Sequence, residues 1–300
     1  MARVPYIWPE QYDAAFCFTI DMDAESPQLW RNRSQASLSM NELEQRRYGM
    51  REGIWNLFDV LRRYEVHATC FVPVFEAETR PWLLESIAEE EHEIGLHGVL
   101  HEVVSELSRD QFCEIIERGV DAVVSRTGKR PKGFRSPSWE MPLWALEVLR
   151  EKGISYDSSL SGYDHPYSLD GLVELPIQWP LDDPVFFRFV SSGASRWAPF
   201  FTSDAARGWV EICEGIEMAH GSAITTVHPW VTGRSSRIRL AEALLEHARS
   251  AERLWVCTAE ELAAYHASSS NMALFDEAGT PPQFDGFLST AAAENRPPKG

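Results

Sequence analysis

Apolar runs of strand length alternate with amphipathic stretches of helix length along most of this chain. The first run, 14–20 (AAFCFTI), is apolar throughout, which is typical of a strand buried on both faces. Six more runs predict strands, at 66–72, 93–96, 132–134, 172–177, 223–227 and 254–257. Stretches with helical spacing lie at 53–64, 81–90, 109–127, 142–152, 203–220 and 237–251. The alternation predicts an α/β fold on a parallel sheet.

The number of strand–helix units favours a barrel over an open sheet. No glycine-rich phosphate loop follows a strand, so a nucleotide-binding sheet has less support. We predict a distorted, incomplete (β/α) barrel of seven or eight strands. At 300 residues and 44% hydrophobic content, we expect one domain over 1–267. The remainder, 268–300, is rich in Ser, Ala, Pro and Gly and is predicted to be a flexible or arm-like tail.

Two regions allow more than one interpretation. The polar segment 30–50 interrupts the first strand–helix step, and it either covers a pocket, meets another subunit or forms a solvated loop. The tail is either disordered or an arm that docks on a neighbouring subunit. The residues that would dock are Leu274, Phe275, Phe284 and Phe287.

Polar residues with chemical potential follow several of the predicted strands. In parallel barrels the carboxyl ends of the strands converge on one rim, so we expect these side chains to meet. They are Asp21 and Asp23 after the first strand, His97 and His101 after the third, Arg135 after the fourth and His228 after a late one. Polar residues at the ends of four separate strands are more than we expect from residues with a structural role alone.

The spacing of these residues favours a metal site. Asp21 and Asp23 share a face of extended backbone, and His97 and His101 share a face if the chain turns helically after His97. Asp and His without a nearby cysteine favour zinc, with cobalt, nickel or manganese as alternatives. Taken alone, the two histidines are also compatible with a chance pair or a loop cap.

These residue types suit metal-assisted hydrolysis of an amide. A divalent ion acidifies water and polarises a carbonyl, while Asp21 would accept the water proton and His228 would protonate the leaving nitrogen. Arg135 would keep Asp21 ionised. The alternatives are a structural salt bridge for Arg135 and a packed histidine before a turn for His228.

Five segments in order carry a family resemblance: TIDMD, HGVLH, FRSPSWE, YDSSL and VHPW. From about residue 6 to about 265, the chain resembles the polysaccharide deacetylases of carbohydrate esterase family four, which share the NodB homology domain. The resemblance implies a deacetylase-type barrel that binds one divalent metal ion. The implied roles are catalytic base for Asp21, metal ligands for Asp23, His97 and His101, orientation of the base for Arg135 and general acid for His228.

One departure from the family pattern points to a particular branch. Met22 separates the two acidic residues, which are adjacent in the most familiar pattern. This resembles the branch of peptidoglycan-deacetylase-like proteins, cyclic imide hydrolases and, more distantly, metal-independent allantoinases. Oligomers in that branch imply a homo-oligomer, either a dimer or a tetramer.

Four further residues are candidates for substrate binding. Trp139 would stack on a ring while Glu140 accepts an amide N–H, and Trp230 would form a similar wall. Asp157 would contribute a hydrogen bond.

The composition of the chain limits which partners and substrates we expect. A net charge of −17 disfavours nucleic acid and anionic membranes. Five scattered cysteines and no export signal predict a cytoplasmic protein with free thiols. We therefore expect a metal-dependent hydrolase that opens a small cyclic imide or ureide. The alternatives are an N-deacetylase of N-acetylated sugars and a non-catalytic barrel that binds a sugar or ureide.

Overall fold

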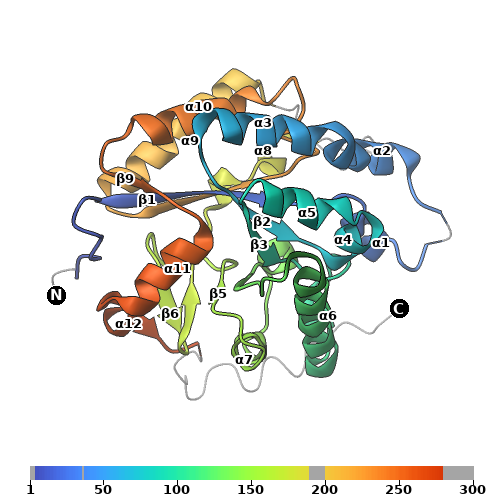
Figure 1. The fold of residues 1–300 in the computed structure, drawn as a ribbon, viewed down its shortest axis with the longest axis horizontal. Coiled ribbons are helices and arrows are strands. Elements are labelled where there is room, and N and C mark those ends of the chain that lie inside the picture. The colour runs from blue at the N-terminus through green and yellow to red at the C-terminus, as the bar shows by residue number, and fades with distance from the viewer. Residues whose placement is uncertain (1–3, 36, 189–199, 280–300) are drawn as a thin grey trace, which may run out of the picture.

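The computed structural model describes residues 4–35, 37–188 and 200–279. Within these residues, ten strands form one sheet around which the helices are arranged (Figure 1). The strands are β1 (Ala14–Asp21), β2 (Thr69–Val72), β3 (Glu93–Leu96), β4 (Gly133–Phe134), β5 (Tyr156–Asp157), β6 (Tyr167–Leu169), β7 (Leu172–Glu174), β8 (Ser222–Val227), β9 (Leu254–Val256) and β10 (Asp276–Glu277).

The sheet runs in the order β10-β6-β7-β5-β4-β3-β2-β1-β8, and β9 also pairs with β1. Neighbours are parallel except β6 and β7, which are antiparallel. Beyond β7, Asp182 bridges to Thr226 of β8, so the two limbs of the sheet approach each other without a full ladder. The predicted incomplete α/β barrel is confirmed.

Twelve α-helices lie in the described residues, and six match the predicted stretches. Helices α3, α9 and α10 lie together on one side of β1, with α11 and α12 on the other side (Figure 1). The helices are α1 (Ser26–Arg31), α2 (Met40–Tyr48), α3 (Ile54–Tyr64), α4 (Val74–Thr79), α5 (Trp82–Glu89), α6 (Arg109–Thr127), α7 (Trp144–Glu151), α8 (Pro184–Phe187), α9 (Thr202–Met218), α10 (Arg239–Ser250), α11 (Ala259–Ser268) and α12 (Asn271–Leu274).

Strand β1 shows why its sequence is apolar at most positions. Phe16, Phe18 and Ile20 belong to one buried cluster, while Ala15 and Cys17 belong to a second. Successive side chains of a strand point to opposite faces, so both faces of β1 are covered. This burial fixes the end of β1, and with it Asp21.

The polar segment 30–50 is largely helical rather than a loop. Its main element, α2, begins after Ser39, whose side chain accepts a hydrogen bond from the Glu42 amide. A π-helical turn, Gly49–Gly53, joins α2 to α3. A Cβ on Gly49 would lie 2.8 Å from the Trp230 amide nitrogen, and one on Gly53 would overlap the Pro229 carbonyl. This segment is therefore fixed tightly against the loop after β8.

The folded part of the chain extends beyond residue 268, where the tail was predicted to begin. Residues 268–279 include α12 and β10, and β10 pairs with β6. Phe275 is buried, and the Asn271 side chain hydrogen-bonds to both the amide and the carbonyl of Ile7. The start of the tail at 268 is thus wrong, because these contacts outweigh its polar composition. Phe284 and Phe287 lie outside the described residues.

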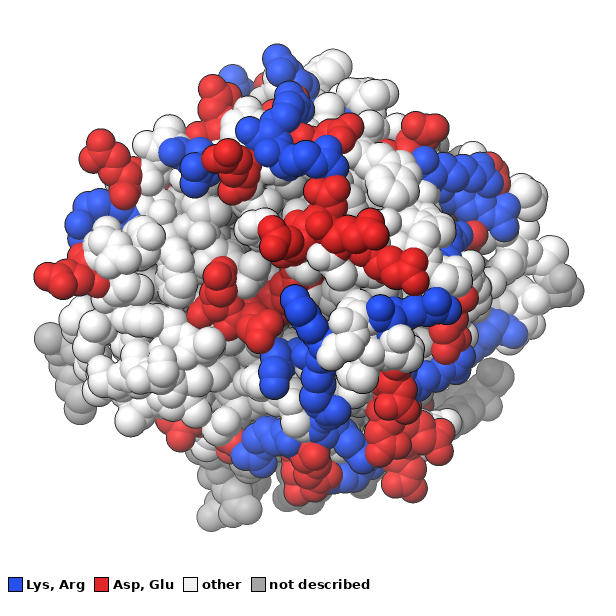
Figure 2. All heavy atoms as spheres, in the orientation of Figure 1, with Lys and Arg blue, Asp and Glu red and all other residues white. Residues whose placement is uncertain are grey.

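The surface of the described part carries both signs of charge. Acidic and basic side chains are interspersed over the face shown in Figure 2, without a broad basic area. None of the helices that the structure describes has the length and apolar character that a membrane span requires.

Candidate active site

A cavity of about 310 Å³ lies at the carboxyl ends of the strands. Each element delivers its residue as predicted: β1 ends at Asp21, His97 follows β3, Arg135 follows β4 and His228 follows β8. The predicted residues that line the cavity are Asp21, Asp23, His97, His101, Trp139, His228 and Trp230. Arg135 is fully buried and acts on the cavity through Asp21.

Asp21 and Arg135 form a buried ion pair. The Arg135 Nη1 donates to Asp21 Oδ1 at 2.7 Å and to Thr19 Oγ1 at 2.7 Å, while its Nε and Nη2 donate to Ser158. Burial alone would raise the pKa of Asp21, but Arg135, with His97 and His228, outweighs it, and the pKa lies below its usual value. Asp21 is therefore held as a carboxylate.

His97 presents a free ring nitrogen to the cavity. Its Nδ1 lies 2.8 Å from the Arg135 carbonyl oxygen, which can only accept, so Nδ1 is the donor and Nε2 is the nitrogen left to act as a ligand. Nε2 is buried, lies 3.7 Å from Asp21 Oδ2 and has no hydrogen-bond partner in the described structure. A neutral imidazole in this tautomer is suited to bind a metal ion.

The chain after His97 does not turn helically, so that expectation is wrong. Gly98 and His101 both adopt left-handed backbone, with φ of 72° and 59°. The Glu102 carboxylate accepts hydrogen bonds from the amides of Val99 and Leu100 and holds this loop instead. The two histidine rings still meet, with centroids 5.0 Å apart.

Asp23 lies between two cationic groups. Its Oδ2 accepts from Arg46 Nη1 of α2 at 2.9 Å, and its Oδ1 lies 3.2 Å from His228 Nε2. The Arg46 guanidinium also covers the Trp230 ring, 4.6 Å from its centroid. Helix α2 thus completes the cavity wall, which favours the interpretation of segment 30–50 as a cover.

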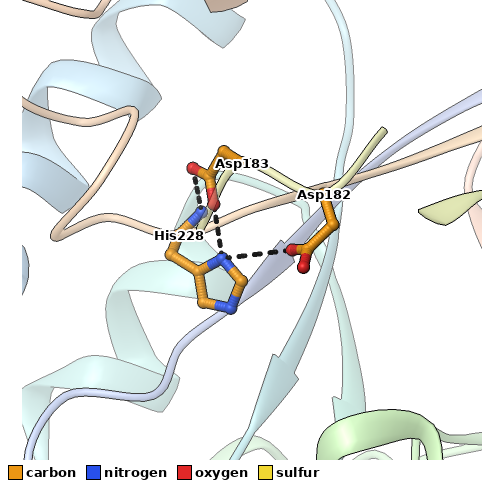
Figure 3. Close-up of side chains that lie close together, drawn as sticks. All are labelled: Asp182, Asp183 and His228. Atoms are coloured by element: carbon orange, nitrogen blue, oxygen red, sulfur yellow. Dashed lines mark hydrogen bonds and ion pairs between the residues drawn. The ribbon is translucent and has the colours of Figure 1, made fainter. Parts of the chain in front are cut away.

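His228 is held from behind by two aspartates (Figure 3). Asp183 accepts from both the backbone amide and Nδ1 of His228, at 2.9 and 2.7 Å, and Asp182 lies 3.9 Å from Nδ1. Burial alone would lower the pKa of His228, but Asp23, Asp183 and Asp182 together raise it to about 10. Its ring is therefore protonated at neutral pH.

Within the described residues, one group of three His, Cys, Asp or Glu side chains has its potential metal-ligand atoms within 4.8 Å of one another: Asp182, Asp183 and His228. Asp183 is already satisfied there, because Thr232 donates to it from its amide and its hydroxyl. The arrangement in Figure 3 is a carboxylate–histidine pair that orients the ring, and it needs no ion to hold it.

The residues predicted to bind a metal share the cavity without forming such a compact group. Asp23 Oδ1 and His97 Nε2 are both buried and accept no hydrogen bond in the described structure. Burial, with repulsion from His97, Arg46 and His228, lowers the pKa of His101 well below its usual value, so this ring is neutral. The donor set of Asp23, His97 and His101 fits a divalent ion chemically, and their role as its ligands stays a prediction.

The predicted substrate-binding residues divide into two groups. Trp139 and Trp230 line the cavity, and Trp179 joins them with its ring 4.6 Å from that of Trp139. Glu140 is exposed, and Asp157 is buried and hydrogen-bonded to Ser159; neither is among the lining residues. Ser138 and Trp139, with left-handed φ of 59° and 58°, both line the cavity, whereas the chain leaves it at Glu140. Asp157 ends β5 and is held away from the cavity by Ser159, so this geometry does not support a substrate contact by Glu140 or Asp157.

Several residues of the site escaped the sequence analysis. Arg46 and Arg31 come from the polar segment that joins β1 to α3, and nothing in their spacing indicated a site. The adjacent acids Asp182 and Asp183, in PLDDPV, did offer a signal. They are two adjacent carboxylates directly before a proline.

Comparison with known proteins agrees with this geometry. The family model described as polysaccharide deacetylase matches residues 48–156. The crystal structure of a candidate polysaccharide deacetylase from Mycobacterium smegmatis is 31% identical, covers 95% of this chain and 99% of its own, and superposes with a TM-score of 0.87. The chain belongs to the polysaccharide deacetylase family. It is therefore a hydrolase of the class that cleaves carbon–nitrogen bonds other than peptide bonds.

Two further similar proteins have names that describe different reactions. A peptidoglycan deacetylase from Helicobacter pylori is 25% identical over 82% of this chain and 94% of its own length. The Puue allantoinase structure covers 87% of this chain and 93% of its own with a TM-score of 0.76, at 19% identity. At that identity the allantoinase shows the shared fold alone.

Proposed function

We propose that this deacetylase-family protein hydrolyses the ring amide of a small cyclic imide or ureide. The observation that carries the proposal is the cavity itself, whose volume of about 310 Å³ suits one small ring compound. Helix α2 walls the cavity through Arg46, whereas a glycan polymer needs an open groove.

Asp21 and His228 divide the proton transfers between them. Asp21, ionised by Arg135, accepts a proton from the attacking water. His228, whose protonated form is stabilised chiefly by Asp23 and Asp183, donates its Nε2 proton to the departing nitrogen. Asp183 fixes the ring so that Nε2 faces the cavity.

Asp23, His97 and His101 would hold one divalent ion, with zinc favoured and cobalt, nickel or manganese as alternatives. When bound, such an ion acidifies a water molecule and polarises the substrate carbonyl. Arg46 would stay on the second oxygen of Asp23 and fix its orientation. The cytoplasmic location and the homo-oligomeric assembly stay predictions.

Deacetylation of an N-acetylated sugar is the second candidate. It is favoured by the peptidoglycan deacetylase named above, which covers most of this chain. The same base and acid serve both reactions, because in each of them water adds to an amide carbonyl carbon and the resulting tetrahedral intermediate expels the nitrogen.

A turnover screen tests both candidates. Succinimide, hydantoin and N-acetylglucosamine are incubated with purified protein and each of the four ions, and ring opening and acetate release are followed separately. Ring opening without acetate supports the imide or ureide reaction, and acetate release from the sugar supports deacetylation. If a compound binds but neither product forms, only the non-catalytic barrel that binds a sugar or ureide is supported.

Metal dependence has its own test. Elemental analysis of the purified protein should find about one divalent ion per chain. Chelation should abolish turnover, and zinc should restore it. Full turnover after the ion is shown to be absent would contradict a metal-dependent reaction.

A further inference from the structure

Two guanidinium groups at the cavity have no side-chain partner among the residues that the structure describes. Arg31, the last residue of α1, and Arg188, which follows α8, both line the cavity. Neither side chain makes a hydrogen bond or an ion pair with any residue that the structure describes. The Arg188 Nε is buried and unbonded in that part of the chain. Residues 189–199, which follow Arg188, contain no Asp or Glu.

These two arginines differ from most arginines of this acidic protein. Arg46, Arg47 and Arg80, which lie nearby, all form ion pairs with carboxylates. Arg31 is exposed, but the buried Nε of Arg188 lacks an acceptor, which is costly because folding has removed its water without supplying a substitute. The cost is offset when a ligand supplies the acceptor.

The charges inside the cavity leave a positive surplus at this wall. Asp21 pairs with Arg135, Asp23 with Arg46 and Asp183 with His228. Burial, together with neighbouring carboxylates, raises the pKa of Asp182 to about 8 despite the opposing effect of His228, so this group is largely uncharged at neutral pH. The charges of Arg31 and Arg188 are left over.

The two arginines and the nearby Glu42 lie within electrostatic reach of one another. Burial, followed by repulsion from Arg188 and Arg46, lowers the pKa of Arg31, whereas Glu42 opposes that shift. Glu42 acts on Arg188 in the same direction. One carboxylate against two guanidinium groups leaves about one positive charge.

We infer that Arg31 and Arg188 bind a carboxylate carried by the substrate, outside the bond that is cleaved. Guanidinium groups match carboxylate oxygens with paired hydrogen bonds. A surplus of about one charge suits a singly charged carboxylate better than a phosphate, which carries closer to two. The inference rests on the proposed function only in placing the reacting amide beside Asp21.

A matched pair of compounds tests this assignment in each candidate reaction. Hydantoin is compared with hydantoin-5-acetic acid, and N-acetylglucosamine with N-acetylmuramic acid, so each pair differs by a carboxylate-bearing group. Binding is measured by calorimetry and turnover by ring opening or acetate release. The carboxylated compound of at least one pair should bind about tenfold or more tightly than its neutral partner.

The variants Arg31→Gln and Arg188→Gln, alone and together, should remove that preference. Binding of the neutral partner should change less than threefold, as expected for loss of the carboxylate contact alone. Arg207→Gln is the matched control, because Arg207 is exposed on α9 and pairs with Asp204. It should retain the full preference.

The outcomes separate this inference from the proposed reaction. A carboxylate preference that the variants abolish, without turnover of any compound, supports the anion site and contradicts the proposed reaction. Turnover without any preference for a carboxylate overturns the anion site and leaves the reaction standing. If the variants lose turnover equally for the charged and the neutral compounds, the arginines act on something common to both, such as the carboxylate formed by hydrolysis. That result would also overturn the inference.

Discussion

The two ends of the sheet contain the same residue types but differ in how their charges are held. At the amino end, a cavity of about 420 Å³ is lined by His67, His92 and Glu93 among others, and it is the larger of the two. There Glu93 accepts hydrogen bonds from Thr69, Tyr156 and the Glu260 amide. At the carboxyl end, opposite charges face one another across the smaller cavity.

The histidines make the contrast plain. Burial, with repulsion from His67, lowers the pKa of His92 to about 4, so its ring is neutral. The neighbouring aspartates, chiefly Asp23 and Asp183, raise the pKa of His228 to about 10, although the two histidines are equally buried. Neither cavity size nor residue type therefore identifies the site. The two ends of the sheet differ in the charged groups that lie beside their histidines.

The largest effect is expected from Asp21→Asn. Loss of the base should lower kcat by about 10³-fold or more. Turnover of the substrate found by the screen measures it, and circular dichroism checks folding, since the buried Arg135 loses its partner. Asp13→Asn, which removes only an exposed pair with Arg253, should stay within twofold. Full activity in Asp21→Asn would exclude Asp21 as the base.

A smaller effect is expected from Asp183→Asn, which leaves His228 in place. Loss of this carboxylate should lower the pKa of His228, and kcat should fall by about ten- to hundredfold. His228 acts as an acid only below its pKa, so the loss of kcat with rising pH should begin at a lower pH in the variant. A pH–rate profile measures this shift, and an unmoved profile would contradict the general-acid role.

At the amino end, Glu93→Gln should alter stability and leave turnover unchanged. Burial raises the pKa of Glu93 from 4.5 to about 7, against the hydrogen bonds of Thr69 and Tyr156. Between these values the folded state keeps a proton that the unfolded state releases, so stability falls as pH rises from about 4.5 to about 7. This component, on the order of 3 kcal/mol, should vanish in the variant. Urea unfolding across that range measures it.

The smallest effect is expected from Trp179→Ala at the cavity rim. Trp179 is 57% exposed and meets Trp139 edge to face, so its removal loosens one wall without touching the acid or the base. KM should rise by about threefold at unchanged kcat. A comparable fall in kcat would show that Trp179 positions the reacting amide.

The sequence predicted those parts of the fold whose residues bury apolar faces. The runs that became β1, β2 and β8 are continuous because both faces of each strand are covered. Helix α2 was missed because its buried positions include Arg46 as well as Leu43, so no apolar stripe is present. Strands β5 and β6 are only two and three residues long, too short for periodicity to show.

The residues of the candidate site were likewise predictable only where they adjoin elements with buried apolar faces. Asp21, His97, Arg135 and His228 were found because each directly follows a strand that its own sequence reveals. Arg31, Arg46, Asp183 and Arg188 come from short helices and turns, whose position depends on contacts far along the chain. The left-handed backbone at Ser138 and Trp139 also follows no residue preference, since both are unusual there.

The contact of Gly49 and Gly53 with the loop after β8 restricts how this protein can change by mutation. A single methyl group at Gly53 would push on the Pro229 carbonyl, one residue from His228, although Gly53 itself meets no reacting atom. Laboratory evolution toward new substrates therefore has room at Arg31, Arg188 and Trp179. At the two glycines, even alanine should be rejected.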